Sequence, residues 1–216
     1  MATDVNISVY NNTQEFQNIV IFQQQDELNQ MFDKLFPIAW KVFPLNPPEP
    51  GQERKGSTIY PIQQRIGVTR NPQSSDKLPY GTLDITQLAE NGQRFKYFLN
   101  EHNAQIITKL DGDNIDTSIS CLNSTPELVS IAFAKNSATL VVQKDVSNGD
   151  QAMFKLTPKL YFMYLNNIKE GDVFKSQITG EHVQEVELTG KTQINAFLKI
   201  DPDVGGNKKI WDITAK

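Results

Sequence analysis

The chain alternates apolar and polar residues with a period of two along most of its length, which is typical of strands that bury one face. Runs such as "VNISVY", "STIYPIQQRIGVT", "RFKYFL", "ATLVVQKDV" and "QINAFLKI" combine this alternation with β-branched and aromatic residues. Turn-forming segments such as "YNNT", "DGDN", "SNGD" and "LTGK" separate the runs. We therefore predict an all-β fold, an antiparallel β-sandwich that forms one domain over residues 1–216.

One segment departs from the strand pattern and predicts a short amphipathic helix near residues 26–36. Its apolar residues recur at the helical spacing i, i+3, i+4, i+7 and i+8: Leu28, Met31, Phe32, Leu35 and Phe36. Asp26 is suited to cap the N-terminus of this helix, and Pro37 would prevent its continuation. Such a helix would close one end of the sandwich or offer a docking face to a partner.

Two stretches of the chain nearly repeat each other. "ISVYNNTQEF" at residues 7–16 and "ISCLNSTPEL" at residues 119–128 share Ile, Ser, Asn, Thr and Glu at equivalent positions, and a short apolar strand follows each. Each half later contains a proline that enters an apolar strand, in "IYPIQQRIGV" and "LTPKLYFMYL". The first match needs an offset of 112 residues and the second an offset near 97, so the second half must be shorter. We predict an internal pseudo-repeat with halves of about 1–110 and 111–216.

The repeated Asn-x-Thr suggests a role in folding. Asn and Thr side chains hydrogen-bond nearby backbone, which makes a tight corner into the next buried strand. Two such corners would shape the interior of the sandwich, or they would mark a pair of equivalent binding clefts.

Charge and hydropathy limit the classes of binding partner that we expect for this chain. The chain carries 21 basic and 25 acidic residues, a net charge of -4, so electrostatics gives no reason to expect nucleic acid or an anionic membrane. No window approaches the roughly 18 apolar residues of a membrane span, and the N-terminus has no pattern of a secretory signal, so we expect a cytoplasmic protein without a stable membrane span. Cys121 is the single cysteine and lies in an alternating run, which predicts a buried hydrophobic role.

Catalytic motifs are not apparent in the sequence. His102 and His182 are the two histidines, and both fall in hydrophilic turns. The chain has no Gly-x-Ser-x-Gly nucleophile elbow and no phosphate-binding glycine loop in a strand-to-helix context. We predict no catalytic residue and no cofactor, and so a protein that is not an enzyme.

An aspartate-rich turn, "DGDNID", is the candidate metal site. It places Asp111, Asp113 and Asp116 close together, and calcium takes several hard oxygen ligands from flexible loops. The turn does not match the EF-hand pattern, and Asp and Gly are also ordinary turn residues, so calcium binding and simple turn formation both remain open.

Aromatic residues are the candidate ligand site. Trp40, Tyr161 and Tyr164 could line a cleft on which a sugar stacks, as in carbohydrate-binding β-sandwiches. Strand alternation places Tyr161 and Met163 on one face and Phe162 and Tyr164 on the other, so at least one pair belongs to a core. The sequence leaves open which of these aromatic residues are exposed.

Several of the same segments resemble the RhiA-like family of rhizosphere-expressed bacterial proteins, which has fungal relatives. The resemblance is carried by "YNNTQEFQNIVIFQ", "IAWKVFP", "STIYPIQQRIGV" and the region from "SATLVV" to "GDVFKS". The matching positions are Asn11, Thr13, Gln17, Asn18, Phe22, Gln23, Ala39, Trp40, Lys41, Thr157, Pro158, Tyr161, Ile168, Lys169 and Gly171. The resemblance implies a shared fold and a cytoplasmic setting, and it brings no established enzymatic activity; "QQQDELNQMFDKLFP" is longer than the family's connection at that position.

These observations favour a non-enzymatic cytoplasmic protein that binds a ligand or self-assembles. Exposed strand edges make self-association easy, so we expect a homo-oligomer. The alternative is a carbohydrate- or calcium-dependent recognition module, lectin-like or membrane-acting.

Overall fold

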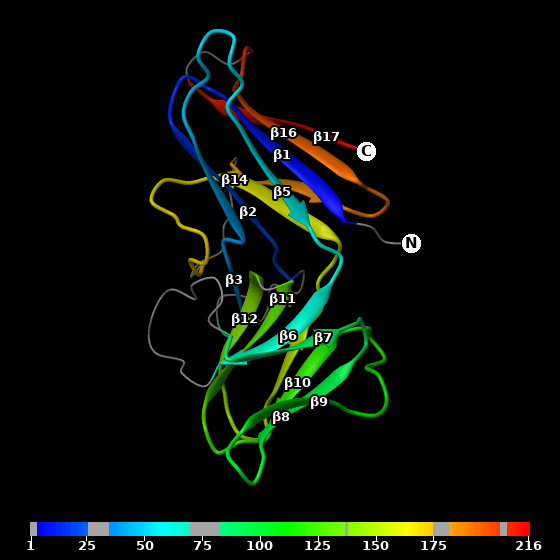
Figure 1. The fold of residues 1–216 in the computed structure, drawn as a ribbon. Helices are drawn as coiled ribbons and strands as arrows, with labels where there is room; N and C mark the ends of the chain where they lie inside the picture. Colours follow the sequence, from blue (N-terminus) through cyan, green and yellow to red (C-terminus); the bar gives the residue numbers. More distant parts are fainter. Residues whose placement is uncertain (1–3, 26–34, 70–82, 137, 175–181, 204–206) are drawn as a thin grey trace.

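The computed structural model describes residues 4–25, 35–69, 83–136, 138–174, 182–203 and 207–216, which form strands, turns and loops (Figure 1). The all-β prediction is confirmed for these residues. Residues 26–34 of the predicted helix lie outside them. The helix prediction is wrong at Leu35 and Phe36, which belong to the short strand β3 (Leu35–Pro37), because pairing with a neighbouring strand overrides the helical spacing. No helix in the described chain could cross a membrane.

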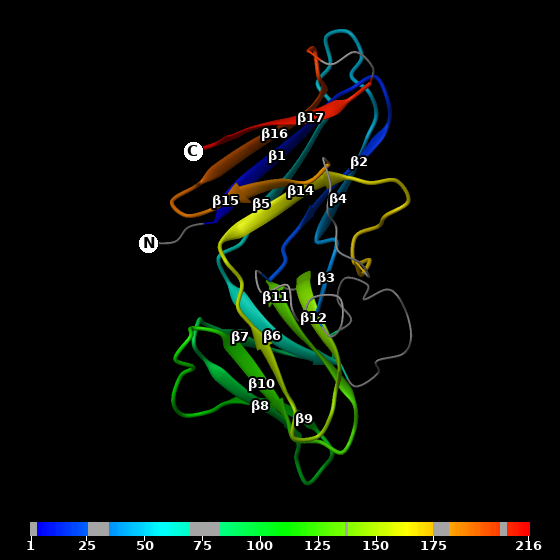
Figure 2. The same cartoon turned by 180° about the vertical axis from the view of Figure 1, so that it is seen from behind.

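Two sheets build lobe 1, which lies at the top of Figure 1 and Figure 2. Its first sheet has the order β17 (Lys209–Ala215), β16 (Gln193–Ile200), β1 (Val5–Asn12) and β5 (Lys55–Tyr60). Its second sheet has the order β15 (Gln184–Glu187), β14 (Lys159–Tyr164), β2 (Gln17–Phe22) and β4 (Lys41–Leu45).

Two further sheets build lobe 2, which lies below lobe 1 in the same views. Its first sheet has the order β13 (Gln151–Phe154), β10 (Ile119–Asn123), β8 (Arg94–Leu99) and β9 (Gln105–Lys109). Its second sheet has the order β3, β12 (Ala138–Val146), β11 (Val129–Lys135), β6 (Gln64–Thr69) and β7 (Ile85–Ala89). The described strands pair antiparallel in both lobes, except that β1 runs parallel to β16 and β10 runs parallel to β8.

The strand pairing repeats between the lobes, so the predicted internal repeat is present. β1, β2, β4 and β5 occupy the places in lobe 1 that β10, β11, β12 and β13 occupy in lobe 2. β14 to β17 correspond in the same way to β6 to β9. Each half of the chain therefore gives its first four equivalent strands to one lobe and its last four to the other, so the two halves exchange strands.

The connections explain the difference in offset between the two repeats. β11 and β12 are separated by two residues, whereas the chain between β2 and β4 is much longer and includes β3. β3 leaves lobe 1 and pairs with the edge of β12 in lobe 2. The first half is longer than the second because it contains this inter-lobe segment.

Alternation of buried residues makes one continuous core. In β1, Val5, Ile7 and Val9 face inward, and in β16 the inward residues are Ile194, Ala196 and Leu198. Equivalent strands of lobe 2 bury residues such as Phe95 and Cys121, and they belong to the same cluster. The lobes are thus joined through their interiors as well as by the chain.

Candidate functional site

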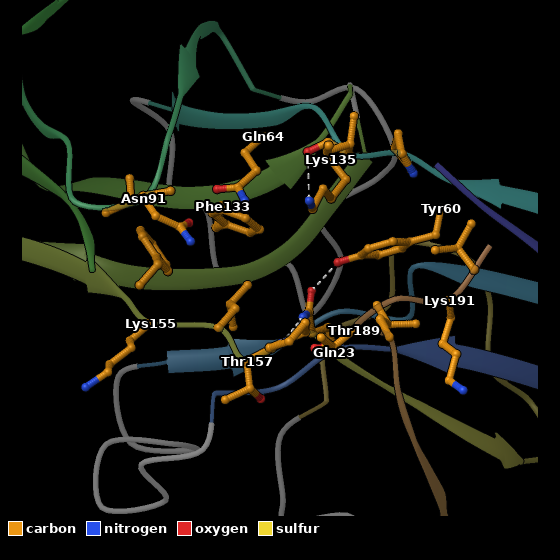
Figure 3. A pocket seen from close by; sticks show the side chains of 18 of the residues that line it. Gln23, Tyr60, Gln64, Asn91, Phe133, Lys135, Lys155, Thr157, Thr189 and Lys191 are labelled. Atoms are coloured by element: carbon orange, nitrogen blue, oxygen red, sulfur yellow. Dashed lines mark hydrogen bonds between the residues drawn. The ribbon is translucent and has the colours of Figure 1, made fainter. Parts of the chain in front are cut away.

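A cleft of about 640 Å³ opens at the junction of the two lobes (Figure 3). Two short connections pass beside it: residues 61–63 link β5 to β6, and residues 155–158 link β13 to β14. We call them the first and second crossovers. Because each crossover carries the chain from one lobe to the other, residues from both halves of the chain line this junction cleft.

Strand alternation directs two equivalent polar side chains toward the junction. Ile19 and Ile21 of β2 face the core, and Gln23 follows at the next position of that face. In β11, Ile131 and Phe133 face the core and Lys135 follows. Gln23 and Lys135 both line the cleft, at matching places in the two halves of the repeat.

Hydrogen bonds tie these side chains to the crossovers. Gln23 Nε2 donates to the Thr157 carbonyl at 2.7 Å, and Gln23 Oε1 accepts from the Tyr60 hydroxyl at 2.6 Å (Figure 3). Lys135 Nζ donates to the Ile62 carbonyl at 3.0 Å. Gln23, which follows β2 in lobe 1, therefore holds the second crossover, and Lys135, at the end of β11 in lobe 2, holds the first.

The Tyr60 ring lies between the two polar residues. Lys135 Nζ is 5.1 Å from the centroid of this ring, and the Trp40 ring packs edge-on against it at a centroid distance of 5.2 Å. Burial raises the pKa of the Tyr60 hydroxyl well above its usual range, although the bond to Gln23 opposes that shift. Tyr60 is therefore a neutral hydrogen-bond donor at physiological pH.

Lys135 is a buried cation in the cleft wall, with a relative exposure of 7%. Burial lowers the pKa of its ammonium to about 8, and the charge of Asp4 partly opposes the shift. Asp4 itself accepts a hydrogen bond from the Ile62 backbone at 2.8 Å. Lys135 is thus still mostly protonated near neutral pH, although burial of its charge away from water is unfavourable.

The described residues that line the cleft include three lysines, Lys135, Lys155 and Lys191, and no aspartate or glutamate. Amide and hydroxyl side chains surround them, and the Gln64 Oε1 atom is buried without a hydrogen-bond partner in the described structure. The apolar part of the wall includes Phe133. This lining suits a partly apolar ligand that carries negative charge.

The structure does not bring the predicted aromatic residues into one cleft. Trp40 is 2% exposed and packs in the main core, whereas Tyr161 is 7% exposed and stacks on Phe22 in a separate cluster on the other face of its sheet. Tyr164 packs half-buried against the main core. The predicted division of Tyr161 and Tyr164 between two faces is what the structure shows, and carbohydrate binding by these residues stays a prediction.

The predicted aspartates also lie in a turn of lobe 2, between β9 and β10. The Asp116 carboxylate accepts bonds from the Ser118 hydroxyl at 2.7 Å and from the Ser118 backbone at 3.2 Å, and these bonds lower its pKa. Asp111 and Asp113 are exposed. Within the described ranges no group of three or more His, Cys, Asp and Glu side chains is arranged to hold a metal ion, so calcium binding also stays a prediction.

The two histidines differ in their contacts. His102 lies exposed in the turn between β8 and β9. His182 is exposed, but its Nδ1 shares a hydrogen bond with the Tyr164 hydroxyl, and its carbonyl accepts a bond from Trp211 Nε1 at 3.1 Å. Neither histidine lines the junction cleft.

Sequence reasoning missed Gln23, Tyr60 and Lys135 as a group. One signal was present: in "IVIFQ" and "IAFAK" a polar residue takes the core-facing position directly after an apolar stripe. What could not be read from the sequence is that the two strand ends meet at one junction.

A family model described as RhiA matches residues 2–204 of the chain. Comparisons with curated proteins and with solved structures gave no match.

Proposed function

This chain belongs to the RhiA family, and from that premise we propose that it is a non-enzymatic protein that binds a small organic molecule in the junction cleft. The cleft carries the proposal, because its volume of about 640 Å³ falls within the roughly 300–1,000 Å³ of small-molecule sites. The lining supports it too, since apolar side chains such as Phe133 and Leu156 share the cleft with polar groups that can fix a ligand's orientation.

A neutral fluorescent probe, phenylnaphthylamine, tests whether the cleft admits an apolar molecule. We expect its fluorescence to rise on binding to the folded protein, and we expect the Leu156→Trp variant to abolish the rise. Leu156 lines the cleft and is half-buried, so the indole of a tryptophan at this position fills part of the cleft.

The matched control is Leu128→Trp, which adds the same ring at an exposed position outside the cleft lining. It should bind the probe as the wild type does. Equal binding by the wild type and Leu156→Trp, with both folded, would overturn the assignment of the cleft.

We place the protein in the cytoplasm as part of the proposal. Cys121, the single cysteine, is a buried free thiol, which supports a fold that does not depend on oxidation. Fractionation of cells that express the protein from its own promoter tests this location, and recovery in the medium would contradict it.

Self-association is a second candidate, favoured by the open edges of the sheets. Three edge strands, β5, β13 and β7, carry apolar side chains that are at least 40% exposed: Ile59, Met153 and Leu88. Unpaired strand edges with apolar side chains are templates for pairing with another chain. Light scattering should report a homo-oligomer that Ile59→Lys dissociates and that Ile115→Lys, in an exposed loop, leaves intact. A monomer at all concentrations would exclude this candidate.

A further inference from the structure

The Lys135 ammonium is buried in the cleft wall, and no carboxylate of the described residues forms an ion pair with it. Among the described residues, its Nζ donates to one carbonyl, that of Ile62, and faces the Tyr60 ring, but no described carboxylate forms an ion pair with it. Buried cations are normally paired, because removing the charge from water costs several kcal/mol unless an opposite charge replaces the solvent. The described residues therefore leave this charge without an ion pair, and the charge of Asp4 only partly offsets its desolvation.

The equivalent position in the first half gives an internal comparison. Gln23 is neutral, and both ends of its side-chain amide are used, by Tyr60 and by Thr157. A glutamine therefore suffices to hold a crossover. Lys135 holds the other crossover with one N–H and places an extra positive charge on the cleft side, which the structural role does not require.

The surroundings of Lys135 also favour an anion. Lys155 and Lys191 line the same cleft, whereas no described lining residue is acidic. The carboxylate whose charge acts on Lys135 is that of Asp4, which is exposed and accepts a hydrogen bond from the Ile62 backbone. Gln64, paired in register with Lys135 on the neighbouring strand, has a buried side-chain oxygen that can accept a bond only from a donor group elsewhere on the ligand, not from the oxyanion itself.

We propose that Lys135 Nζ binds an oxyanion of an organic ligand, a carboxylate or a phosphate, whose apolar body contacts Phe133, Phe154 and Leu156. The inference rests on the proposed function, since it names the ligand class of the same cleft. An oxyanion there replaces the lost hydration of the ammonium with a charge-assisted hydrogen bond. The apolar body adds to the binding free energy by displacing water from the rings of Phe133 and Phe154.

Two probes that share one ring system test the proposal. Anilinonaphthalene sulfonate carries a sulfonate oxyanion, and phenylnaphthylamine is the same molecule without it. We expect the wild type to bind the sulfonate at least about tenfold more tightly than the neutral probe, the ratio that one charge-assisted bond supplies.

The decisive variant is Lys135→Gln, which places at this position the residue that its structural equivalent already has. It keeps a donor for the Ile62 carbonyl and removes the charge. We expect it to bind the sulfonate about tenfold more weakly and the neutral probe within about twofold of the wild type. Lys96→Gln removes a lysine outside the cleft and should change neither value.

The outcomes separate the two proposals. If neither probe binds in a way that Leu156→Trp blocks, the binding function itself fails. If the neutral probe binds but the sulfonate shows no preference, or if Lys135→Gln leaves that preference intact, only the anion proposal is overturned. If the sulfonate is preferred and Lys135→Gln removes the preference, displacement of the sulfonate by decanoate or by decyl phosphate identifies the preferred oxyanion. Equal displacement by decanol would contradict the role of Lys135.

Discussion

Asn11 and Asn123 make matching sets of hydrogen bonds, although they lie 112 residues apart in the sequence. Each side-chain amide donates at 2.8 Å to the carbonyl four residues further along the chain. Each also donates at 2.9 Å to the last residue of a neighbouring strand, Leu45 in lobe 1 and Val146 in lobe 2. The Asn-x-Thr corner is thus the same device in both lobes, and it joins the two sheets of each sandwich.

Replacing either asparagine should destabilise the protein strongly. Each side-chain oxygen also accepts bonds from the threonine two residues on, at 3.0 Å from its backbone and 2.8 Å from its hydroxyl. Asn11→Ala or Asn123→Ala removes all the bonds of the buried side-chain amide at once, so we expect a loss of about 2–4 kcal/mol in urea unfolding. Asn12→Ala removes an exposed neighbour and should stay within about 0.5 kcal/mol. Equal effects of Asn11→Ala and Asn12→Ala would contradict the corner's role.

Removing the Tyr60 hydroxyl should weaken the junction. Tyr60→Phe leaves Gln23 Oε1 without its bond of 2.6 Å in a buried setting, and an unpaired buried acceptor costs about 1–3 kcal/mol. Tyr10→Phe is the control, because the Tyr10 ring stacks on Phe197 and no hydrogen bond to its hydroxyl is seen in the described structure. Thermal unfolding of both variants measures the difference, and a Tyr60→Phe variant as stable as Tyr10→Phe would show that the bond is dispensable.

Local patterns predicted most of the elements of this fold. Period-two alternation identified the strands, and the repeated Asn-x-Thr identified the corners, because both signals depend on residues close together in the chain. Leu35 and Phe36 are the counterexample. Their spacing satisfied a helix, but the β12 edge of lobe 2 offered hydrogen-bond partners more than 100 residues away, and no local pattern records such a partner.

The site was harder to predict than the fold. The aromatic prediction depends on residue type alone, and burial of Trp40 and Tyr161 in two different clusters keeps these residues apart. Lys135 and Gln23 reach one cleft because the two halves exchange strands, and that exchange is fixed by pairing between segments distant in sequence. Alternation alone could show that both residues face inward, but not that they face the same space.

The buried ammonium of Lys135 should make stability depend on pH in an identifiable window. Its pKa is lowered by burial from 10.5 to about 8, so between these values the unfolded chain binds a proton that the folded chain has released. Stability from this group therefore rises with pH from about 8 to 10.5, with a slope of at most about 1.4 kcal/mol per pH unit, and is unchanged below pH 8. The difference in unfolding free energy between the wild type and Lys135→Gln should follow this rise; a difference that is flat across the window would contradict it.

The Cys121 thiol should be unreactive in the folded protein. Burial raises its pKa to about 12, although a hydrogen bond with the Tyr97 backbone opposes the shift. The nucleophilic thiolate is therefore scarce at pH 8. We expect an aromatic disulfide reagent to react negligibly with the native protein and with one thiol per chain after unfolding in guanidinium. Rapid stoichiometric reaction in native buffer would mean that the core of lobe 2 opens readily.

The exchange of strands between the halves predicts the behaviour of a cleaved chain. A protease site inserted beside Gly112, in the exposed turn between β9 and β10, divides the protein into its two repeats. All four sheets contain strands from both sides of this cut; for example, β1 and β5 from the first repeat pair with β16 and β17 from the second. We therefore expect the two fragments to remain in one particle after cleavage.

Size-exclusion chromatography with light scattering measures this outcome directly. The cleaved protein should elute with the intact protein in native buffer and should separate into fragments only in urea, because separation requires breaking ladders in all four sheets. A site inserted beside Gly149, in the exposed β12–β13 turn, is the comparison, since it cuts within lobe 2 between strands of the same repeat. Fragments of the Gly112 cut that separate without denaturant would mean that each repeat folds on its own, and the strand exchange would then be wrong.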